Sequence, residues 1–302
     1  MKRITDWWFT PAPAERLAAL RIFIGGYAFL YLWIRFGEFL AISRLPVAQW
    51  KAVGVTTWSG HLPPSVVIAL VVATMVALGA FVLGAGYRYV APIAAVGLLF
   101  VTTYRNSWGM VFHTENLLVL HVAALSLAPA ADAWSIDRRR GWVRAHEGGY
   151  GWAIKLLVAL TAATYVLAGV AKLRIAGLDW IDGELLRNQI AIDNLRKALL
   201  GDSIAPLATQ FLEHPAGFTI FSALTMVLEL GAPIALVGGR PARMWALAIW
   251  GFHVGVVLLM NIWFLYPLVF VAFLPVVNCE RPIAWAIRRV RDRRRAGMPP
   301  TS

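Results

Sequence analysis

Long apolar runs limit most strongly what this chain can fold into. About eight runs, each of roughly 17 residues or more, carry almost no charge, and this is the length that an α-helix needs to cross a bilayer. Charged residues make up 15% of the chain, against about 25% in soluble domains. The sequence therefore predicts an all-α, polytopic helical membrane bundle with about eight transmembrane helices, near residues 17–36, 65–84, 87–105, 115–134, 151–173, 216–238, 243–260 and 262–278, of which the last two can also form one broken helix.

The distribution of Lys and Arg predicts how these helices are oriented. With eight spans the two termini share one side, which receives seventeen of the basic residues, whereas the other side receives seven. Because basic residues are retained on the cytoplasmic side, we expect both termini to be cytoplasmic and the protein to lie in the inner (plasma) membrane. The net charge of +12 largely reflects this bias, so we expect no nucleic-acid partner.

Two segments fall outside the expected spans. Residues 281–302 form a basic tail with seven Arg residues after a membrane domain of residues 1–280, and such a tail is expected to contact the anionic lipids of the bilayer. Residues 175–215 lie between the fifth and sixth spans, and their apolar residues recur at helical spacing in "GELLRNQIAIDNLRKALLGD". We expect one or two amphipathic helices there, lying on the extracytoplasmic face.

Lys172 lies near the end of the fifth apolar run, where a lysine is costly. One interpretation is that its side chain reaches outward to the lipid headgroups. The other is that it points inward, where a desolvated ammonium loses its charge easily and becomes a base or a nucleophile. Gly169, one turn earlier, permits the close approach of a second helix or of a ligand.

Further polar side chains interrupt the apolar runs. His113 and Asn116 are three residues apart, which predicts that both lie on one helical face, and an imidazole there can act as a general acid or base. His253 lies in the middle of a span and Asn261 near its outer end. Each of these residues can instead be a hydrogen-bonded group that holds helices together.

Two charged residues lie within other apolar runs. Arg21, near the cytoplasmic end of the first span, either reaches toward the headgroups or serves the site. Glu229 is predicted to be an inward-pointing carboxylate that pairs with Arg21, with Lys155 or with a histidine.

The sequence does not predict a metal site or thiol chemistry. His113, His121 and Glu115 do not share one helical face at the spacing that metal ligands require. Cys279 is the single cysteine, which excludes a disulfide-exchange mechanism within this chain.

Several motifs carry a resemblance to a known family. "YVLAGVAKL" followed by "DWIDG" resembles the motif of vitamin K-dependent gamma-glutamyl carboxylase, which has the form Y-x-x-A-G-V-x-K-L followed by D-W-x-x-G. "FTPAPAERLAALRIFIGGYAFL", "AADAWSID" and "FHVGVVLLMN" resemble other segments of that family in the same order. Together they indicate the HTTM domain, a membrane module shared by the carboxylase and many bacterial proteins, over about residues 8–280.

This resemblance implies a catalytic role for Lys172 at the extracytoplasmic face. In the carboxylase family a lysine at this position is the proposed base that deprotonates reduced vitamin K, with oxygen and carbon dioxide as cosubstrates. The expected activity is therefore carboxylase-like quinol epoxidation, with reduced vitamin K or menaquinol as the cofactor and His113 as a second catalytic residue. The candidate residues that bind the quinone or the substrate are Asn116, His253, Asn261, Trp108, Trp180, Arg21 and Glu229.

Two alternatives to an enzyme remain from the sequence. The large C-terminal soluble domain of the animal carboxylases has no counterpart in these 302 residues, so a small peptide, a free lipid quinol or a different acceptor is the expected substrate. One alternative is a maturation or export factor for a small secreted peptide, which requires a groove under residues 175–215. The other is a transporter or a structural membrane protein, although no inverted repeat is visible.

Overall fold

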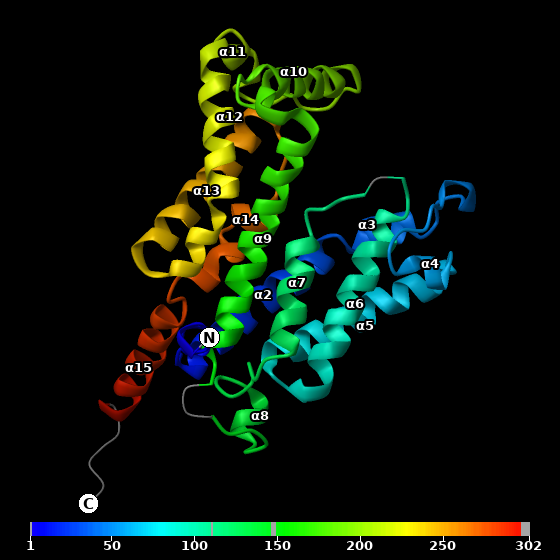
Figure 1. Ribbon diagram of the computed structural model, residues 1–302. Helices are drawn as coiled ribbons and strands as arrows, with labels where there is room; N and C mark the ends of the chain where they lie inside the picture. The colour runs from blue at the N-terminus through cyan, green and yellow to red at the C-terminus, as the bar shows by residue number, and fades with distance from the viewer. Residues whose placement is uncertain (1, 110, 146–148, 297–302) are drawn as a thin grey trace, which may run out of the picture. The chain divides into compact units, whose positions relative to one another are not determined.

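The computed structural model describes residues 2–109, 111–145 and 149–296, with side chains as far as Arg289 (Figure 1). Every regular element in these ranges is a helix, which confirms the predicted all-α fold. The chain divides into two compact units, unit 1 with Met1–Leu157 and Val277–Ser302 and unit 2 with Val158–Val276. The helix α9 (Gly151–Ala176) begins in unit 1 and continues into unit 2.

Unit 1 is built around four packed helices, α2 (Ala14–Ile34), α5 (Pro64–Leu83), α6 (Tyr87–Asn106) and α7 (Asn116–Ser126). In this group α5 contacts α2 and α6, and α7 contacts α6 and α2, so the four helices close a ring. Apolar side chains such as Leu17, Leu78, Leu98 and Leu118 fill its interior. The shorter elements and the basic helix are α1 (Lys2–Trp8), α3 (Phe36–Ile42), η1 (Val47–Gln49), α4 (Thr56–Ser59), α8 (Ile136–Arg139) and α15 (Glu280–Ala296).

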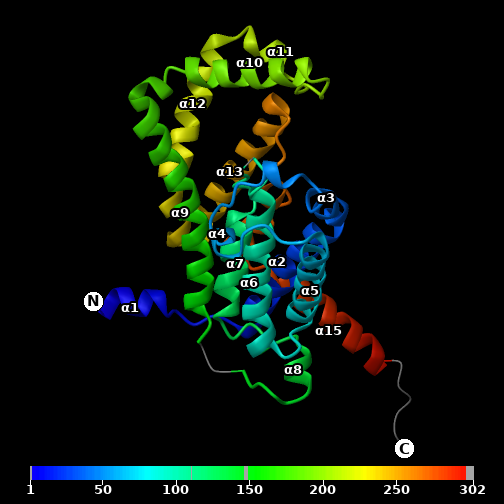
Figure 2. The same ribbon diagram turned by 90° about the vertical axis from the view of Figure 1, so that its right-hand side faces the viewer.

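Unit 2 contains most of α9 together with α12 (Pro215–Leu230) and α13 (Gly239–Met260). Tyr165, Trp245, Ile249 and Phe273 lie at the centre of its apolar core. Helix α10 (Glu184–Leu199) lies across one end of α12 and α13, which it contacts (Figures 1 and 2). The remaining elements are η2 (Gly177–Trp180), α11 (Ala208–Leu212), η3 (Ala232–Val237), α14 (Leu265–Leu268) and η4 (Val271–Val276).

Four helices are long and apolar enough to cross a membrane within the part of the chain that is described. These are α2, α5, α13 and the continuous segment of α9 and η2. Helix α6 has the expected bounds, but charged and polar residues at both ends lower its hydropathy. The chain is therefore a helical membrane protein, and the side of the membrane on which its termini lie stays a prediction.

Three expected spans are wrong in extent. The run over 115–134 forms only the 11-residue α7, which at about 1.5 Å per residue is about 16 Å long. The run over 216–238 ends as α12 at Leu230, because Pro233 follows and has no N–H to continue the ladder. The run over 262–278 breaks into α14 and η4, which contain Pro267 and Pro275, and Asn261 in the left-handed region separates it from α13.

Both segments outside the spans contain helices, as expected of residues 175–215. Residues 177–212 contain η2, α10 and α11. Helix α10 is not cleanly amphipathic, because Leu195 and Leu199 are exposed whereas Asn194 and Lys197 are buried. The basic tail begins as α15, which contacts α2, and its last residues, 297–302, lie outside the described residues. The division into a membrane domain and a tail at residue 280 stays a prediction.

Candidate functional site

Unit 2 encloses a cavity of about 390 Å³ between α12, α13 and the overlying α10. This volume falls within the range of about 300–1,000 Å³ that is typical of small-molecule sites. Its walls are apolar side chains on one face of each helix, namely Phe221, Leu224 and Leu228 of α12, Phe252, Val256 and Leu259 of α13, and Leu186 and Ile190 of α10. Its polar lining residues include Lys172, Gln189 and Thr225.

Lys172 reaches the cavity from α9 and forms an ion pair with Glu229 of α12. The ammonium Nζ lies 2.6 Å from both carboxylate oxygens. The Glu229 side chain is 3% exposed, whereas that of Lys172 is 22% exposed and belongs to the cavity lining. The lysine therefore points inward, and the expected partners of Glu229 (Arg21, Lys155 or a histidine) are wrong because the nearest cation is Lys172.

Close packing of α9 on α12 makes this pair possible. A Cβ on Gly169 would lie 2.9 Å from Leu230 Cδ2 and 3.2 Å from Glu229 Cβ. Because both distances are shorter than ordinary carbon contacts, a larger residue would push the helices apart. The glycine one turn before the lysine thus brings the two charges together.

Trp180 forms a second contact with the lysine. Its ring centroid lies 5.4 Å from the Lys172 ammonium, a cation–π distance. The residue is 6% exposed, and its buried Nε1 has no hydrogen-bond partner among the described residues. Since a buried indole N–H normally finds an acceptor, this unpaired donor is an unusual feature of a residue that lines the cavity.

The "DWIDG" sequence explains how Trp180 is held. Gly183 has a φ of +90°, which favours glycine, and it packs directly against the backbone of α12 at Phe218. Thr219 of α12 donates a hydrogen bond of 2.6 Å to the carbonyl of Asp182. The turn after Trp180 is thereby fixed to the same helix that carries Glu229.

Two glycines of α13 leave part of the cavity open. Gly251 and Gly255 are spaced as in the small-residue motif that packs membrane helices closely, yet both face the cavity. A Cβ built on either residue would meet no described atom within 4 Å. The face that another helix would normally cover is therefore free for a flat apolar ligand.

Helix α10 is fastened over the end of α13. The Asn194 amide donates to the carbonyl of Leu259 over 2.9 Å, and Lys197 donates to the carbonyl of Met260. Lys197 also pairs with Asp193 at 2.7 Å. Burial alone would raise the pKa of the Asp193 carboxyl, but hydrogen bonds from its basic neighbours on α10 outweigh burial and hold that pKa below its usual value.

His253 lies behind the cavity wall rather than on it. Its Nε2 lies 2.8 Å from the hydroxyl of Tyr165, and this bond links α13 to α9. Asn261, by contrast, ends α13 in a left-handed conformation. Its amide nitrogen donates to the carbonyl of Ser203, and its oxygen accepts from Trp263 Nε1. Both residues hold helices and turns together in this structure, and their role in binding stays a prediction.

The remaining candidate residues belong to unit 1. Arg21 is fully buried and donates to the carbonyls of Ala130 and Trp134, so it does not reach the headgroups. His113 lies in the loop before α7, whose first residue is Asn116. The prediction that these two share a helical face is wrong, because the helix starts too late to include the histidine.

Trp108 belongs to an aromatic cluster of unit 1. Its ring packs edge-on against Trp50 and His61, with centroids 5.1 Å and 5.6 Å away. Like Trp180, it has a buried Nε1 without a hydrogen-bond partner among the described residues. The catalytic or binding roles of these unit 1 residues stay predictions.

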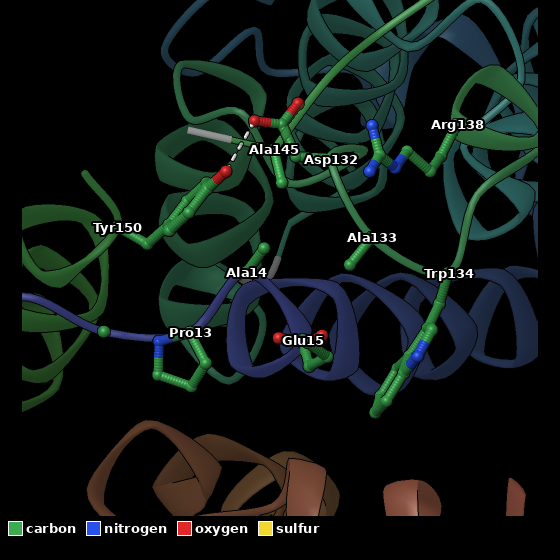
Figure 3. Close-up of a pocket in the computed structure, with 10 residues that line it drawn as sticks. Pro13, Ala14, Glu15, Asp132, Ala133, Trp134, Arg138, Ala145 and Tyr150 are labelled. Carbon is green, nitrogen blue, oxygen red and sulfur yellow. Dashed lines mark hydrogen bonds between the residues drawn. The ribbon is translucent and has the colours of Figure 1, made fainter. Parts of the chain in front are cut away.

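A second cavity, of about 420 Å³, lies in unit 1 (Figure 3). Tyr150 donates a hydrogen bond of 2.8 Å to Asp132 across it, and Arg138 lines one side. This wall contains the "AADAWSID" segment, in which Asp137 accepts from the backbone N–H groups of Gly86 and Tyr87 at the start of α6. These contacts fix the loop to the bundle, so the segment has an evident structural role.

Comparison with known proteins places the unit 2 site in context. The family model of the HTTM domain matches residues 9–280. The chain belongs to the HTTM-domain family. No curated protein and no solved structure matches this member of the family.

Lys172, Trp180 and Glu229 of this HTTM protein were all predicted as site residues, and they lie together in unit 2. Gln189 and Thr225, whose polar side chains lie on otherwise apolar faces, were not predicted, and neither was the gap at Gly251 and Gly255. The glycine spacing was visible in the sequence, but it normally predicts helix packing rather than a cavity.

Proposed function

We propose that this HTTM protein is a quinol-linked membrane enzyme with carboxylase-like or epoxidase-like chemistry in the unit 2 cavity. The observation that carries the proposal is an inward-pointing Lys172 in the wall of an apolar cavity of ligand size. Buried lysines are rare in membrane segments and mark functional sites by default. The basic-residue distribution supports a site on the extracytoplasmic side of the inner membrane.

The cavity suits a flat, apolar molecule that carries a few oxygen atoms. At Gly251 and Gly255, which line the cavity, an added Cβ would meet no described atom within 4 Å, and this supports an open face for a ring or an isoprenoid chain. The free Nε1–H of Trp180 is a donor for an oxygen of the ligand, and Gln189 adds a polar group from α10. Reduced vitamin K or menaquinol has this combination of features, so the residues present fit the group.

When bound, a quinol supplies an ionisable hydroxyl group and reducing equivalents for reaction with oxygen, and the proposed carboxylation takes up carbon dioxide. The protein contributes binding, proton transfer and exclusion of water. Lys172 is the proposed base, Trp180 orients an oxygen of the ligand, and the apolar side chains Leu186 and Ile190 of α10 shield the site. In a shielded site of this kind, charge interactions are stronger than in water.

Quinol oxidation by the purified protein in nanodiscs tests the proposal. Reduced menaquinone and reduced vitamin K are supplied with oxygen and bicarbonate, and the epoxide is measured by mass spectrometry. Epoxide formation should be lost in Lys172→Ala and kept in Lys155→Ala, which removes a lysine of the same helix that bonds to Thr10 outside the site. Quinol recovered unchanged from the wild type, with and without glutamate-containing peptides, contradicts the proposal.

The alternative of a maturation or export factor for a secreted peptide has one supporting observation. The hypothesis requires a groove under residues 175–215, and the cavity lies beneath α10, which belongs to that segment. A photo-crosslinking amino acid at Gln189 distinguishes the two functions in cells. A crosslinked product identified by mass spectrometry as a short secreted peptide supports the alternative, and adducts with quinone alone contradict it.

A further inference from the structure

The ion pair in the cavity wall determines where a proton can go. We infer that Glu229 is the final acceptor of the proton taken from the ligand, and that Lys172 relays it. The relay rests on the proposed function in one respect, namely that the ligand is a quinol with an ionisable hydroxyl group. The pair itself is independent of that function.

The geometry of the pair supports transfer between its members. Both Glu229 oxygens lie 2.6 Å from the Lys172 ammonium, a short distance for a charged hydrogen bond. The Trp180 ring contacts the ammonium, and the small Gly169 lets α12 with Glu229 approach α9 closely. The carboxylate lies deeper than the ammonium, with 3% of its side chain exposed against 22%. Lys172, and not Glu229, belongs to the cavity lining.

A paired lysine cannot act as a base on its own. Its ammonium has three donors and no acceptor, so it must release a proton before it can take one. Release to water would leave the Glu229 carboxylate buried without its cation, which is strongly unfavourable. Release to Glu229 leaves both groups neutral. The hydroxyl of Tyr165 is already bonded to His253, and Asp179 is exposed, so neither replaces Glu229 as the acceptor.

The relay balances in protons and charge. An N–H bond of Lys172 breaks and an O–H bond of Glu229 forms. The O–H bond of the ligand's hydroxyl then breaks, and a new N–H bond of Lys172 forms. The result is one proton moved from the hydroxyl to the carboxylate, and the ammonium then faces the negative hydroxyl oxygen instead of Glu229. No electron is gained or lost.

Two measurements on Glu229→Gln and Glu229→Asp test this role. The first is the rate at which a small amine-acylating reagent labels Lys172 at one mildly alkaline pH, measured by mass spectrometry, because only a neutral amine reacts. The second is turnover of menaquinol. In Glu229→Gln we expect labelling at least about tenfold faster, equivalent to about 1.4 kcal/mol, together with turnover at least about tenfold slower. In Glu229→Asp, which keeps a carboxylate, the labelling rate and the turnover should both lie between those of Glu229→Gln and the wild type.

This combination separates the relay from other roles of Glu229. A lysine that acts alone would be more active in Glu229→Gln, so wild-type or higher turnover in that variant overturns the inference, as does unchanged labelling. Asp193→Asn, which breaks a similar lysine pair on α10, should leave Lys172 labelling unchanged. If Glu229→Gln does not fold, the Lys172→Gln/Glu229→Gln double variant shows why. Folding of the double variant attributes the failure to the unpaired ammonium of Lys172. Labelling and turnover are then compared between the wild type and Glu229→Asp.

An infrared measurement distinguishes failure of the inference from failure of the proposed function. Adding menaquinol without oxygen should produce a protonated-carboxyl band in the wild type that Glu229→Gln lacks. If the band appears but no epoxide forms under oxygen, the relay stands and the proposed chemistry fails. If the quinol binds without the band, the relay is overturned whether or not epoxide forms.

Discussion

Replacing Gly255 by Leu should close part of the unit 2 cavity without weakening the fold. A Cβ at this position meets no described atom within 4 Å, and glycine within a helix destabilises by about 0.5–1 kcal/mol relative to alanine, so the thermal stability should not fall. Leucine places four additional carbon atoms beside the cavity. If the leucine displaces about four ligand atoms from their contacts, at about 0.3 kcal/mol of binding free energy each, the ligand loses about 1.2 kcal/mol of binding free energy. The expected result is an affinity about eightfold weaker.

Equilibrium binding of a labelled menaquinone analogue to the protein in nanodiscs measures this effect. Gly26→Leu is a matched control, because Gly26 lies in the membrane helix α2 of unit 1 and a Cβ there also meets no described atom within 4 Å. The control should bind as the wild type does. Wild-type affinity in both Gly255→Leu and Gly251→Leu would refute the placement of the ligand in this cavity.

Three further predictions concern the packing around the site. Gly169→Val should separate α9 from α12 and lower the free energy of unfolding by about 1–3 kcal/mol, and an unchanged thermal midpoint in detergent would contradict the close approach. The lowered pKa of Asp193 means that its carboxylate stabilises the fold above the unfolded-state pKa of about 3.9 and that this contribution disappears as the pH falls through the lower folded-state pKa. Asp193→Asn should therefore lower the thermal midpoint at pH near 7 and much less in strong acid, whereas an equal difference at both pH values would contradict this. Tyr165→Phe should remove the bond to His253 and cost about 1–3 kcal/mol, measured by denaturation, because the imidazole is left unsatisfied, and stability equal to the wild type would refute that link.

Helix positions could be predicted where an apolar run coincides with residues that start and stop a helix. Helix α5 begins at Pro64, where a missing N–H does no harm, and ends before the left-handed Gly84. The run over 216–238 is also largely apolar, but Pro233 interrupts it. Hydropathy records the side chains and not the backbone N–H groups on which a continuous helix depends.

The candidate site could be predicted only in part. Lys172 was identified because a charge is costly in an apolar run, which is a local property of the sequence. Its partner was not identified, since Glu229 lies 57 residues away and three other kinds of partner were equally compatible with the pattern. The His113 prediction failed in its geometry because the loop before α7 ends only at residue 115.

By itself, the sequence determined the all-α membrane fold and the presence of a lysine that must be either paired or functional. Both follow from the cost of exposing polar groups to lipid, which depends on composition and order along the chain. The tertiary structure alone decided that Glu229 pairs with Lys172, that the N–H of Trp180 has no partner among the described residues, and that the α13 glycines border a cavity. These features depend on the spacing of separate helices to within a few tenths of an ångström. Packing between the helices determines that spacing, and the local sequence does not.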